Sequence, residues 1–379
     1  MEFGAFITGF VPASRREGNP HAEHDVLMED LAVAQAADAA GFKYVWASEH
    51  HFLDEYSHLS ANDAVLGYLA KATERIHLGA GIFNPLPQVN HPVKVAERVA
   101  MLDHLSEGRF EFGTGRGAGS HEILAFLPEM KDLSKTRDIW EDVIAEFPKM
   151  WTQDVYEGYE GTYWSMPPRR ILPKPYVAPH PAMWYAAGNT SSYEMAARRG
   201  LGVLGFSVQS LEELGPVLKS YKSAVPHAEP IGSFVNDNVM VTTSAWVAED
   251  DERAVRSAVD SRIGYLNSNM FRYHDTFPHP EWVPPWPELL PEPTEDLLRA
   301  TLGTGGLVLG DPDRALAACR RWEEAGADQL VFAVFAAPHQ DALETIRLIG
   351  QHVIPKVDTD PEHRTNRFRR EAVQRSPVV

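Results

Sequence analysis

The chain has 379 residues, a formal net charge of −18 at pH 7 and one cysteine. That length suits either one large β/α barrel or two ordinary domains, and a surface this acidic argues against nucleic acid or an anionic membrane as partner. The single Cys319 excludes a disulfide framework and a cysteine-based metal site. No apolar run is long enough to span a membrane, and the first residues resemble a strand rather than a signal peptide, so we expect a cytoplasmic protein.

Segments with strand-like and helix-like patterns alternate along the chain. In the first half, strands are predicted at residues 2–8, 43–48, 76–83 and 109–113, and helices at 25–40, 62–73 (with Asn62 as cap) and 92–105. In the second half, strands are predicted at 182–186, 201–206, 238–247 and 329–334, and helices at 134–151, 191–199, 211–223, 250–271, 311–325 and 340–353. Eight strands that alternate with helices predict an α/β fold, a parallel (β/α)8 barrel of the TIM type.

Two proline-containing segments interrupt this alternation, near residues 156–181 and 273–303. The first has a candidate hairpin at 156–164, and both are predicted to be insertions because proline clusters prevent regular structure. We expect residues 1–355 to form a single barrel domain. The charged residues 356–379 are predicted to be a C-terminal arm or tail.

A cluster of titratable side chains, Glu49-His50-His51, follows the second predicted strand. The C-terminal ends of barrel strands face the active site, and histidine can transfer a proton near neutral pH. The cluster could instead be an ordinary surface loop, or it could bind a metal together with His21, His24 and His58. Metal sites need three or four ligands in fixed geometry, and His21-Ala22-Glu23-His24 lacks the helical spacing of a known motif. We therefore favour proton transfer beside an organic cofactor and predict no metal.

Two loops after later strands could bind phosphate. Residues 113–119 contain four glycines, which allow close backbone approach to a ligand, and Arg116, which can bind phosphate with two hydrogen bonds. Residues 187–192 open a predicted helix with small and hydroxyl side chains, an arrangement suited to anions and equally to ordinary helix capping. The third strand has Gly79 and Gly81 near its end, where the backbone could approach a flat ring or simply pack closely.

The order of these motifs resembles the bacterial luciferase-like, flavin-dependent monooxygenase family over residues 1–355. The motifs that carry the resemblance are Glu49-His50-His51-Phe52, Leu78-Gly79, Leu86-Pro87, His91-Pro92, Ala96-Glu97, Leu102-Asp103, residues 105–109, the glycine-rich segment 112–117, residues 186–197, Leu309-Gly310-Asp311-Pro312 and residues 324–328. The resemblance implies a barrel that binds reduced FMN at the C-terminal ends of its strands. It further implies that O2 forms a C4a-peroxyflavin, which oxidises a small organic substrate such as an aldehyde or ketone.

The resemblance also implies roles for single residues. His50 corresponds to the catalytic histidine, His51 and Glu49 to its neighbours, and Glu122 to an acidic position near the flavin. Arg116 corresponds to the phosphate-binding arginine, and Gly81 and Ile82 to a non-proline cis peptide under the flavin ring. The remaining implied cofactor contacts are Gly188, Asn189, Thr190, Ser191 and Ser192, and the implied lid residues at an apolar substrate pocket are Phe277, Trp282 and Trp286.

Family resemblance further implies a separate NAD(P)H-dependent flavin reductase as the source of reduced FMN, and a homodimer. The sequence departs from luciferase at Gly115, where luciferase has a reactive cysteine, and at Gly188, where it has a glutamate. We therefore expect an ordinary monooxygenase without light emission. The rival hypotheses are a coenzyme F420-dependent oxidoreductase on the same barrel, a metal-dependent hydrolase using His21, His24, His50 and His51, and a non-catalytic flavin-binding homologue.

Overall fold

Eight parallel strands close into a barrel in the computed structural model, which describes residues 1–117, 119–206, 210–276 and 279–375. The barrel strands are β1 (Glu2–Ile7), β2 (Tyr44–Ala47), β3 (His77–Ala80), β4 (Phe110–Thr114), β7 (Ala182–Ala186), β8 (Gly202–Phe206), β9 (Val239–Val247) and β11 (Gln329–Ala333). Each pairs with the next in this order, and β11 pairs with β1 to close the ring. The predicted (β/α)8 barrel is confirmed.

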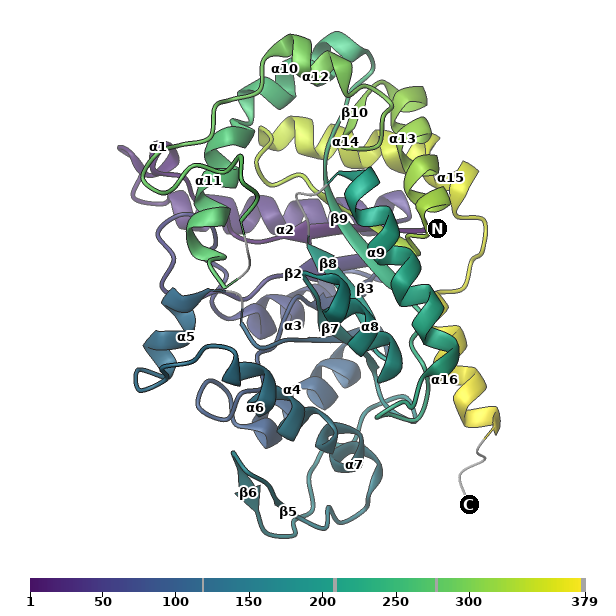
Figure 1. The fold of residues 1–379 in the computed structure, drawn as a ribbon. Coiled ribbons are helices and arrows are strands. Elements are labelled where there is room, and N and C mark those ends of the chain that lie inside the picture. Colours follow the sequence, from purple (N-terminus) through teal and green to yellow (C-terminus); the bar gives the residue numbers. More distant parts are fainter. Residues whose placement is uncertain (118, 207–209, 277–278, 376–379) are drawn as a thin grey trace.

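Helices surround this barrel and connect its strands (Figure 1). The longer ones are α2 (Ala22–Ala40), α3 (Asn62–Ala72), α4 (Pro92–Leu105), α6 (Lys135–Ile144), α8 (Thr190–Arg198), α9 (Leu211–Ala224), α10 (Asp251–Asp260), α11 (Ile263–Tyr273), α13 (Pro312–Ala325), α14 (His339–His352) and α16 (Arg364–Arg375). The shorter ones are α1 (Ala13–Arg16), α5 (Ser120–Phe126), α7 (Glu146–Thr152), α12 (Glu295–Ala300), α15 (Ile354–Val357) and the 3-10 turn Val225–His227. None of the helices in the described ranges has the length and apolar character that crossing a membrane requires.

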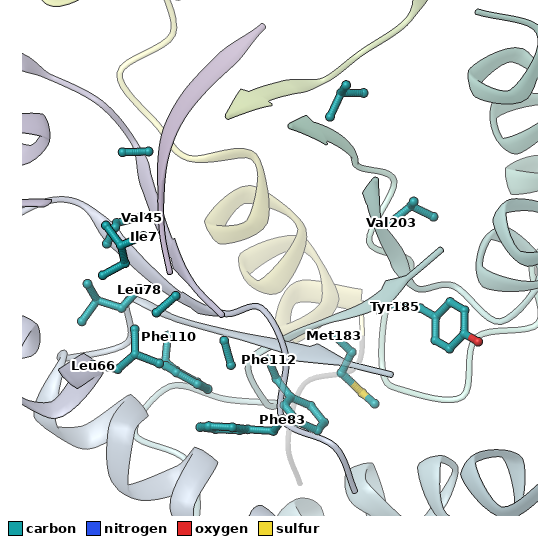
Figure 2. Close-up of a cluster of buried hydrophobic side chains, with 14 of the residues drawn as sticks. Ile7, Val45, Leu66, Leu78, Phe83, Phe110, Phe112, Met183, Tyr185 and Val203 are labelled. Carbon is teal, nitrogen blue, oxygen red and sulfur yellow. The ribbon is translucent and has the colours of Figure 1, made fainter. Parts of the chain in front are cut away.

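The main apolar core lies between the strands and the surrounding helices. Alternate strand residues such as Val45, Leu78 and Phe112 point outward into it, together with Leu66 of α3 (Figure 2). Period-two alternation sends the other residues of each strand into the barrel. Close packing of these many apolar side chains makes the strand ends a rigid frame for the residues that follow them.

Aromatic side chains fill the barrel interior. Trp46 and Trp184 meet edge to face with ring centroids 5.2 Å apart, in a cluster that also contains Phe6 and Leu204. A Cβ on Gly79 would lie 2.1 Å from the Trp46 ring, so this glycine is required by core packing. The filled interior restricts any ligand to the ends of the barrel.

Helix α16 covers the N-terminal end of the barrel, on the same side as the chain's N-terminus (Figure 1). Thr365 donates a hydrogen bond to Glu111 Oε1 inside the barrel at 2.6 Å, and Arg369 pairs with the buried Asp103 at 3.3 Å. Residues 356–379 were expected as an arm or tail, but their described part includes this packed helix. The pattern-based expectation underestimated it because its contacts are mostly polar.

Four predicted features differ in detail from the structure. The helix expected at 250–271 is divided into α10 and α11 at Arg262, which has a left-handed φ of 49°. The helix expected at 134–151 is divided into α6 and α7, and the hairpin expected at 156–164 pairs β5 (Tyr159–Glu160) with β6 (Ser165–Met166). Asn62 lies inside α3 rather than at its cap, because its side chain donates to the Ala47 carbonyl at 3.1 Å.

Candidate active site

A cavity of about 280 Å³ lies at the C-terminal ends of the barrel strands. Residues after β2, β3, β4 and β7 line it, together with parts of α5 and α11, which lie on the opposite side of the barrel from α16 (Figure 1). Of the predicted site residues, the lining includes Glu49, His50, His51, Gly81, Ile82, Arg116, Glu122, Gly188 and Ser192. Residues from four separate parts of the sequence therefore converge on one cavity.

His50 is held by Glu122, which lies at the start of α5. Nδ1 of His50 is 3.2 Å from Oε2 of Glu122, and the backbone N–H of His51 also donates to this carboxylate. Burial opposes ionisation of Glu122, but the hydrogen bonds from His50 and His51 outweigh it and hold its pKa below the usual range. An ionised Glu122 accepts a hydrogen bond from Nδ1–H, so Nε2 of His50 is left to give or take a proton in the cavity.

The position of Glu122 differs in one respect from the sequence expectation. It was expected among the cofactor contacts, and it does line the cavity. Its carboxylate, however, is engaged by the two histidines. Glu122 therefore orients His50, and the sequence contained no signal for this pairing because the two residues are 72 positions apart.

His51 is oriented by Glu49, with Nε2 3.6 Å from Oε1 of the carboxylate. The nearby Glu49 carboxylate raises the pKa of His51, against the effect of burial. The two adjacent histidines thus have separate carboxylate partners. This arrangement holds one positive charge more readily at His51 than a free histidine would.

Arg116 supplies a positive charge to the cavity without a carboxylate partner among the described residues. One guanidinium nitrogen donates to Thr136 Oγ1 at 3.0 Å, and the guanidinium also has a hydrogen-bonding interaction with the Tyr185 phenol. The charge also reaches Tyr185 on the cavity wall, where burial raises the phenol pKa and Arg116 partly offsets the increase. A half-buried cation with free donors is suited to an anionic group of a ligand.

The loop before α8 is arranged partly as helix capping. Asn189 Oδ1 accepts from Ser192 N at 3.0 Å and from the Ser191 hydroxyl at 2.8 Å. Gly188 and Ser192 line the cavity, whereas Asn189, Thr190 and Ser191 are exposed and do not. The Asn189 side chain turns back onto its own helix, so of the five predicted contacts Gly188 and Ser192 line the cavity in this structure.

The backbone between Gly81 and Ile82 has the cis peptide bond that the family resemblance implies. Both residues line the cavity directly after β3. Their position brings backbone and the Ile82 side chain to the same wall as Gly115, whose added Cβ would meet Ile82 Cδ1 at 2.8 Å.

The segment after α11 forms one side of the cavity, but through residues other than those expected. Trp282 and Trp286 are 58% and 46% exposed and do not line it. Trp286 instead stacks on Arg272, with the guanidinium 4.5 Å from the ring centroid. The two tryptophans, predicted to line a substrate pocket, therefore lie outside this cavity, and Phe277 lies outside the described residues.

Other side chains from this part of the chain line the cavity without having been predicted. They are Met270, Phe271, His274, His279 and Pro280, and Tyr56 joins them from the loop after β2. His274 directly follows the end of α11, so its position depends on the break at Arg262. A histidine at the end of a helix has no motif around it, and only the three-dimensional arrangement identifies it.

No group of three or more His, Cys, Asp or Glu side chains with metal-binding geometry occurs in residues 1–117, 119–206, 210–276 and 279–375. His58, which lies in the same loop as His50, bonds to Glu23 at 3.0 Å and to a backbone carbonyl. The residues named for the hydrolase hypothesis therefore do not form a coordination shell.

The site combines an apolar cavity, two histidines oriented by carboxylates and one cation, Arg116, that has no carboxylate partner among the described residues. Such a cavity can hold a flat aromatic group, fix an anionic substituent at Arg116 and transfer a proton at His50. Similar arrangements of one cation and glycine-rich loops bind phosphate-bearing cofactors.

Sequence comparison relates the chain to known proteins. The model of a family described as luciferase-like monooxygenase matches residues 1–329. The oxygenase component of flavin-dependent trigonelline monooxygenase from Acinetobacter baylyi is 28% identical over 270 residues, which cover 70% of each chain. Limonene 1,2-monooxygenase from Rhodococcus erythropolis is 26% identical over 375 residues, covering 95% of this chain and 87% of that protein. The alkanal monooxygenase alpha chain of the Kryptophanaron alfredi symbiont is 28% identical, but the match spans only 54% of either chain.

Solved structures share the fold. Monooxygenase RslO1 from Streptomyces bottropensis superposes with a TM-score of 0.75 at 24% identity, over 94% of this chain and 99% of that one. The oxygenating constituent of 3,6-diketocamphane monooxygenase from Pseudomonas putida, a type II Baeyer-Villiger enzyme in complex with FMN, gives 0.72 at 18% identity over 94% and 98%. An F420-dependent secondary alcohol dehydrogenase gives 0.66 at 17% identity over 94% and 98%. At these identities the likeness establishes the barrel and leaves the cofactor open.

Proposed function

Because the chain belongs to the luciferase-like monooxygenase family and is a flavin-dependent monooxygenase, we propose that its flavin is reduced FMN and its substrate a small aldehyde or ketone. Reduced FMN supplies the two electrons with which O2 is divided between the product and water. The observation that carries the proposal is the presence of Arg116 and the His50–Glu122 pair in the same apolar cavity.

The residues of the cavity fit such a cofactor. Arg116, free of any carboxylate in the described chain, would hold the phosphate, with Gly188 and Ser192 beside it. The backbone at Gly81 and Ile82 would support the ring system. Because flavins without phosphate offer Arg116 no anion, this fit favours FMN over riboflavin.

His50 is proposed as the residue that moves the proton. Glu122 fixes its tautomer through Nδ1, so Nε2 can give a proton to, or take one from, an oxygen atom in the cavity. His51 and Glu49 would keep a second positive charge close by. The apolar wall formed by Phe6, Phe206 and Met270 would exclude water, which protects the reaction from wasteful release of hydrogen peroxide.

We also propose a separate NAD(P)H-dependent flavin reductase as the source of reduced FMN. The name of the Acinetobacter relative, an oxygenase component, supports a two-component system. A homodimer remains part of the proposal, supported by the exposed apolar side chains of Tyr68 on α3 and of Met101 and Leu105 on α4.

The second candidate function is an F420-dependent oxidoreductase. The likeness in fold to the F420-dependent secondary alcohol dehydrogenase supports it. Both cofactors carry phosphate, so Arg116 alone does not separate them. The paired histidines with their own carboxylates favour oxygen chemistry, which needs a proton donor and acceptor in the cavity.

Single-turnover oxygenation under ¹⁸O2 tests the proposal. The protein is loaded anaerobically with reduced FMN, mixed with ¹⁸O2 and a panel of aldehydes and ketones, and the products are analysed by mass spectrometry. We expect one ¹⁸O atom in the product, and in His50→Ala we expect retained FMN binding with hydrogen peroxide in place of product. Full product yield in His50→Ala would remove His50 from the mechanism. Reduction of F420 by an alcohol without O2, with no binding of reduced FMN, would establish the second candidate.

A further inference from the structure

We propose that Tyr56 and His274 form a hydrogen-bonding corner of the cavity that holds the oxygen atom of a neutral, otherwise apolar substrate. This inference rests on the proposed function, because it defines the class of substrate that the same cavity accepts. A carbonyl or hydroxyl compound with a hydrocarbon body belongs to that class.

The two side chains lie together with His50. Ring centroids are 5.5 Å apart for Tyr56 and His274, 5.2 Å for His50 and Tyr56, and 5.9 Å for His50 and His274. All three residues line the cavity. An oxygen atom bound between Tyr56 and His274 would therefore lie beside the histidine that is proposed to transfer the proton.

Both polar groups of the corner lack partners in the described part of the chain. Nε2 of His274 is enclosed and has no hydrogen-bond partner there. Tyr56 is 1% exposed and lines the cavity, and its hydroxyl makes no hydrogen bond to a described residue. Leaving an enclosed group such as the His274 nitrogen without a partner has a free-energy cost, because its hydrogen bonds to water are lost. A ligand oxygen that accepts from one or both groups would recover that cost, which makes the corner selective for oxygenated ligands.

His274 is suited to a neutral partner. Burial, with smaller contributions from the nearby His50 and His279, lowers its pKa to about 4, although Glu122 and Asp275 act in the opposite direction. The imidazole is therefore neutral at pH 7 and offers one donor and one acceptor. A carboxylate or phosphate would find no charge there, whereas a carbonyl or hydroxyl oxygen would find a matching partner.

The residues on either side of His274 are anchored. The Tyr273 hydroxyl bonds to Asp54 Oδ2 at 3.1 Å, and the Asp275 carboxylate accepts from Ser120 N at 2.7 Å. These bonds tie the end of α11 to the loop after β2 and to α5. His274 is thus held against the cavity by its neighbours, although Nε2 of its ring has no hydrogen-bond partner among the described residues.

The corner lies across the barrel from the cation. Tyr56 follows β2 and His274 belongs to the connection after β9, and β1 and β11 separate these strands in the ring. Arg116 and Ser192 follow β4 and β7, which occupy the other side of the ring. Phe206, Met270 and Phe271 surround the corner, so the substrate's hydrocarbon body would contact an apolar wall while its oxygen atom reached Tyr56 and His274.

Binding of a matched pair of probes tests the corner. Cyclohexanone and methylenecyclohexane have nearly the same shape, but only the ketone accepts a hydrogen bond. Their affinities are measured by competition and ligand-observed NMR with FMN-loaded and FMN-free protein, so a failure of FMN to bind would count against the proposed function alone. We expect wild type to bind the ketone about tenfold more tightly, the size of one net hydrogen bond.

Variants locate the preference. His274→Phe and Tyr56→Phe should each reduce it toward equal binding of the two probes, and His274→Gln should restore part of it. Phe271→Leu changes the apolar wall alone. It should alter the affinities of the two probes alike and leave the ratio between them intact. In ¹⁵N-histidine spectra of the wild type, the His274 signals, assigned by their absence in His274→Gln, should move with the ketone and not with the hydrocarbon.

Three results would overturn the inference. In the first, wild type binds no ketone or binds both probes equally. In the second, His274→Phe and Tyr56→Phe both keep the ketone preference. In the third, FMN alone moves the His274 signals and the ketone preference is lost. The last result would assign the corner to the flavin.

Discussion

Nδ1 of His50 lies 3.2 Å from Oε2 of Glu122, although 72 positions separate the two residues in the chain. One residue belongs to the loop after β2 and the other to α5 after the glycine-rich loop. The barrel brings these loops to the same end, so the acid–histidine pair is a product of the fold. It fixes which nitrogen of His50 can react in the cavity.

Replacing Glu122 with glutamine tests this pairing. A neutral amide cannot stabilise a protonated His50, and it offers one oxygen in place of two to the donors at His50 and His51. We expect oxygenation to fall on the order of 100-fold, while the dissociation constant for FMN changes by less than about threefold. Rapid-quench product analysis and anaerobic FMN titration measure the two effects separately.

The control for this variant is Glu129→Gln. Glu129 lies in the exposed connection after α5 and forms no ion pair with any described residue. It should leave both quantities unchanged. Normal oxygenation by Glu122→Gln would show that the carboxylate does not support His50.

A second prediction concerns pH and the barrel interior. Burial raises the pKa of Glu111 to about 7, although Thr365 and Trp184 donate hydrogen bonds to it. The folded protein thus holds this proton more tightly than the unfolded chain, in which the pKa is near 4.5. The resulting stabilisation is complete below pH 4.5 and is lost as the pH rises through about 7.

Urea unfolding of Glu111→Gln at several pH values measures this contribution. The variant cannot ionise, so its stability should decrease less between pH 4.5 and pH 7 than that of wild type, by roughly 3 kcal/mol. Burial also raises the pKa of Asp30 to about 7. This residue is present in both proteins, so it should contribute the same dependence of unfolding free energy on pH to each. Parallel pH profiles for the two proteins would show that Glu111 titrates normally.

A third prediction concerns helix α16. Arg369 is 3% exposed and pairs with Asp103, whose side chain is completely buried. Arg369→Ala would leave that carboxylate without its partner, at a cost of about 3–5 kcal/mol in unfolding free energy. Chemical denaturation should show this loss.

The matched control is Arg375→Ala on the same helix. Arg375 pairs with Glu371 at 3.0 Å, but its side chain is 79% exposed. Exposed pairs of this kind contribute at most about 0.5 kcal/mol. Equal destabilisation by the two variants would mean that α16 does not depend on its buried ion pair.

The sequence predicted the barrel because the strands that form it are short, apolar and regularly spaced. It also predicted the cavity residues that belong to strand ends, such as His50, Arg116 and Gly81. Their location follows from the rule that the C-terminal ends of barrel strands meet at one face. Each of these residues could be assigned to the cavity once the strand before it had been recognised in the sequence.

The parts that were not predicted depend on contacts between distant segments. The break at Arg262 redirects α11, and His274 reaches the cavity through it. Trp282 and Trp286 have the composition of a substrate wall, but Arg272 holds Trp286 at the surface. Helix α16 has few apolar residues, and its attachment through Thr365 and Arg369 becomes visible only when their partners are known.

Anaerobic titration with reduced FMN and reduced riboflavin tests the central claim most directly. Wild type should bind reduced FMN at least about tenfold more tightly than reduced riboflavin. The control variant Arg137→Ala removes a cation that is already paired with Glu141 at 3.4 Å, and it should keep the same preference. Arg116→Ala should lose that preference while still binding riboflavin. Equal affinity of wild type for the two flavins, or an unchanged preference in Arg116→Ala, would contradict the assignment of this cavity to FMN.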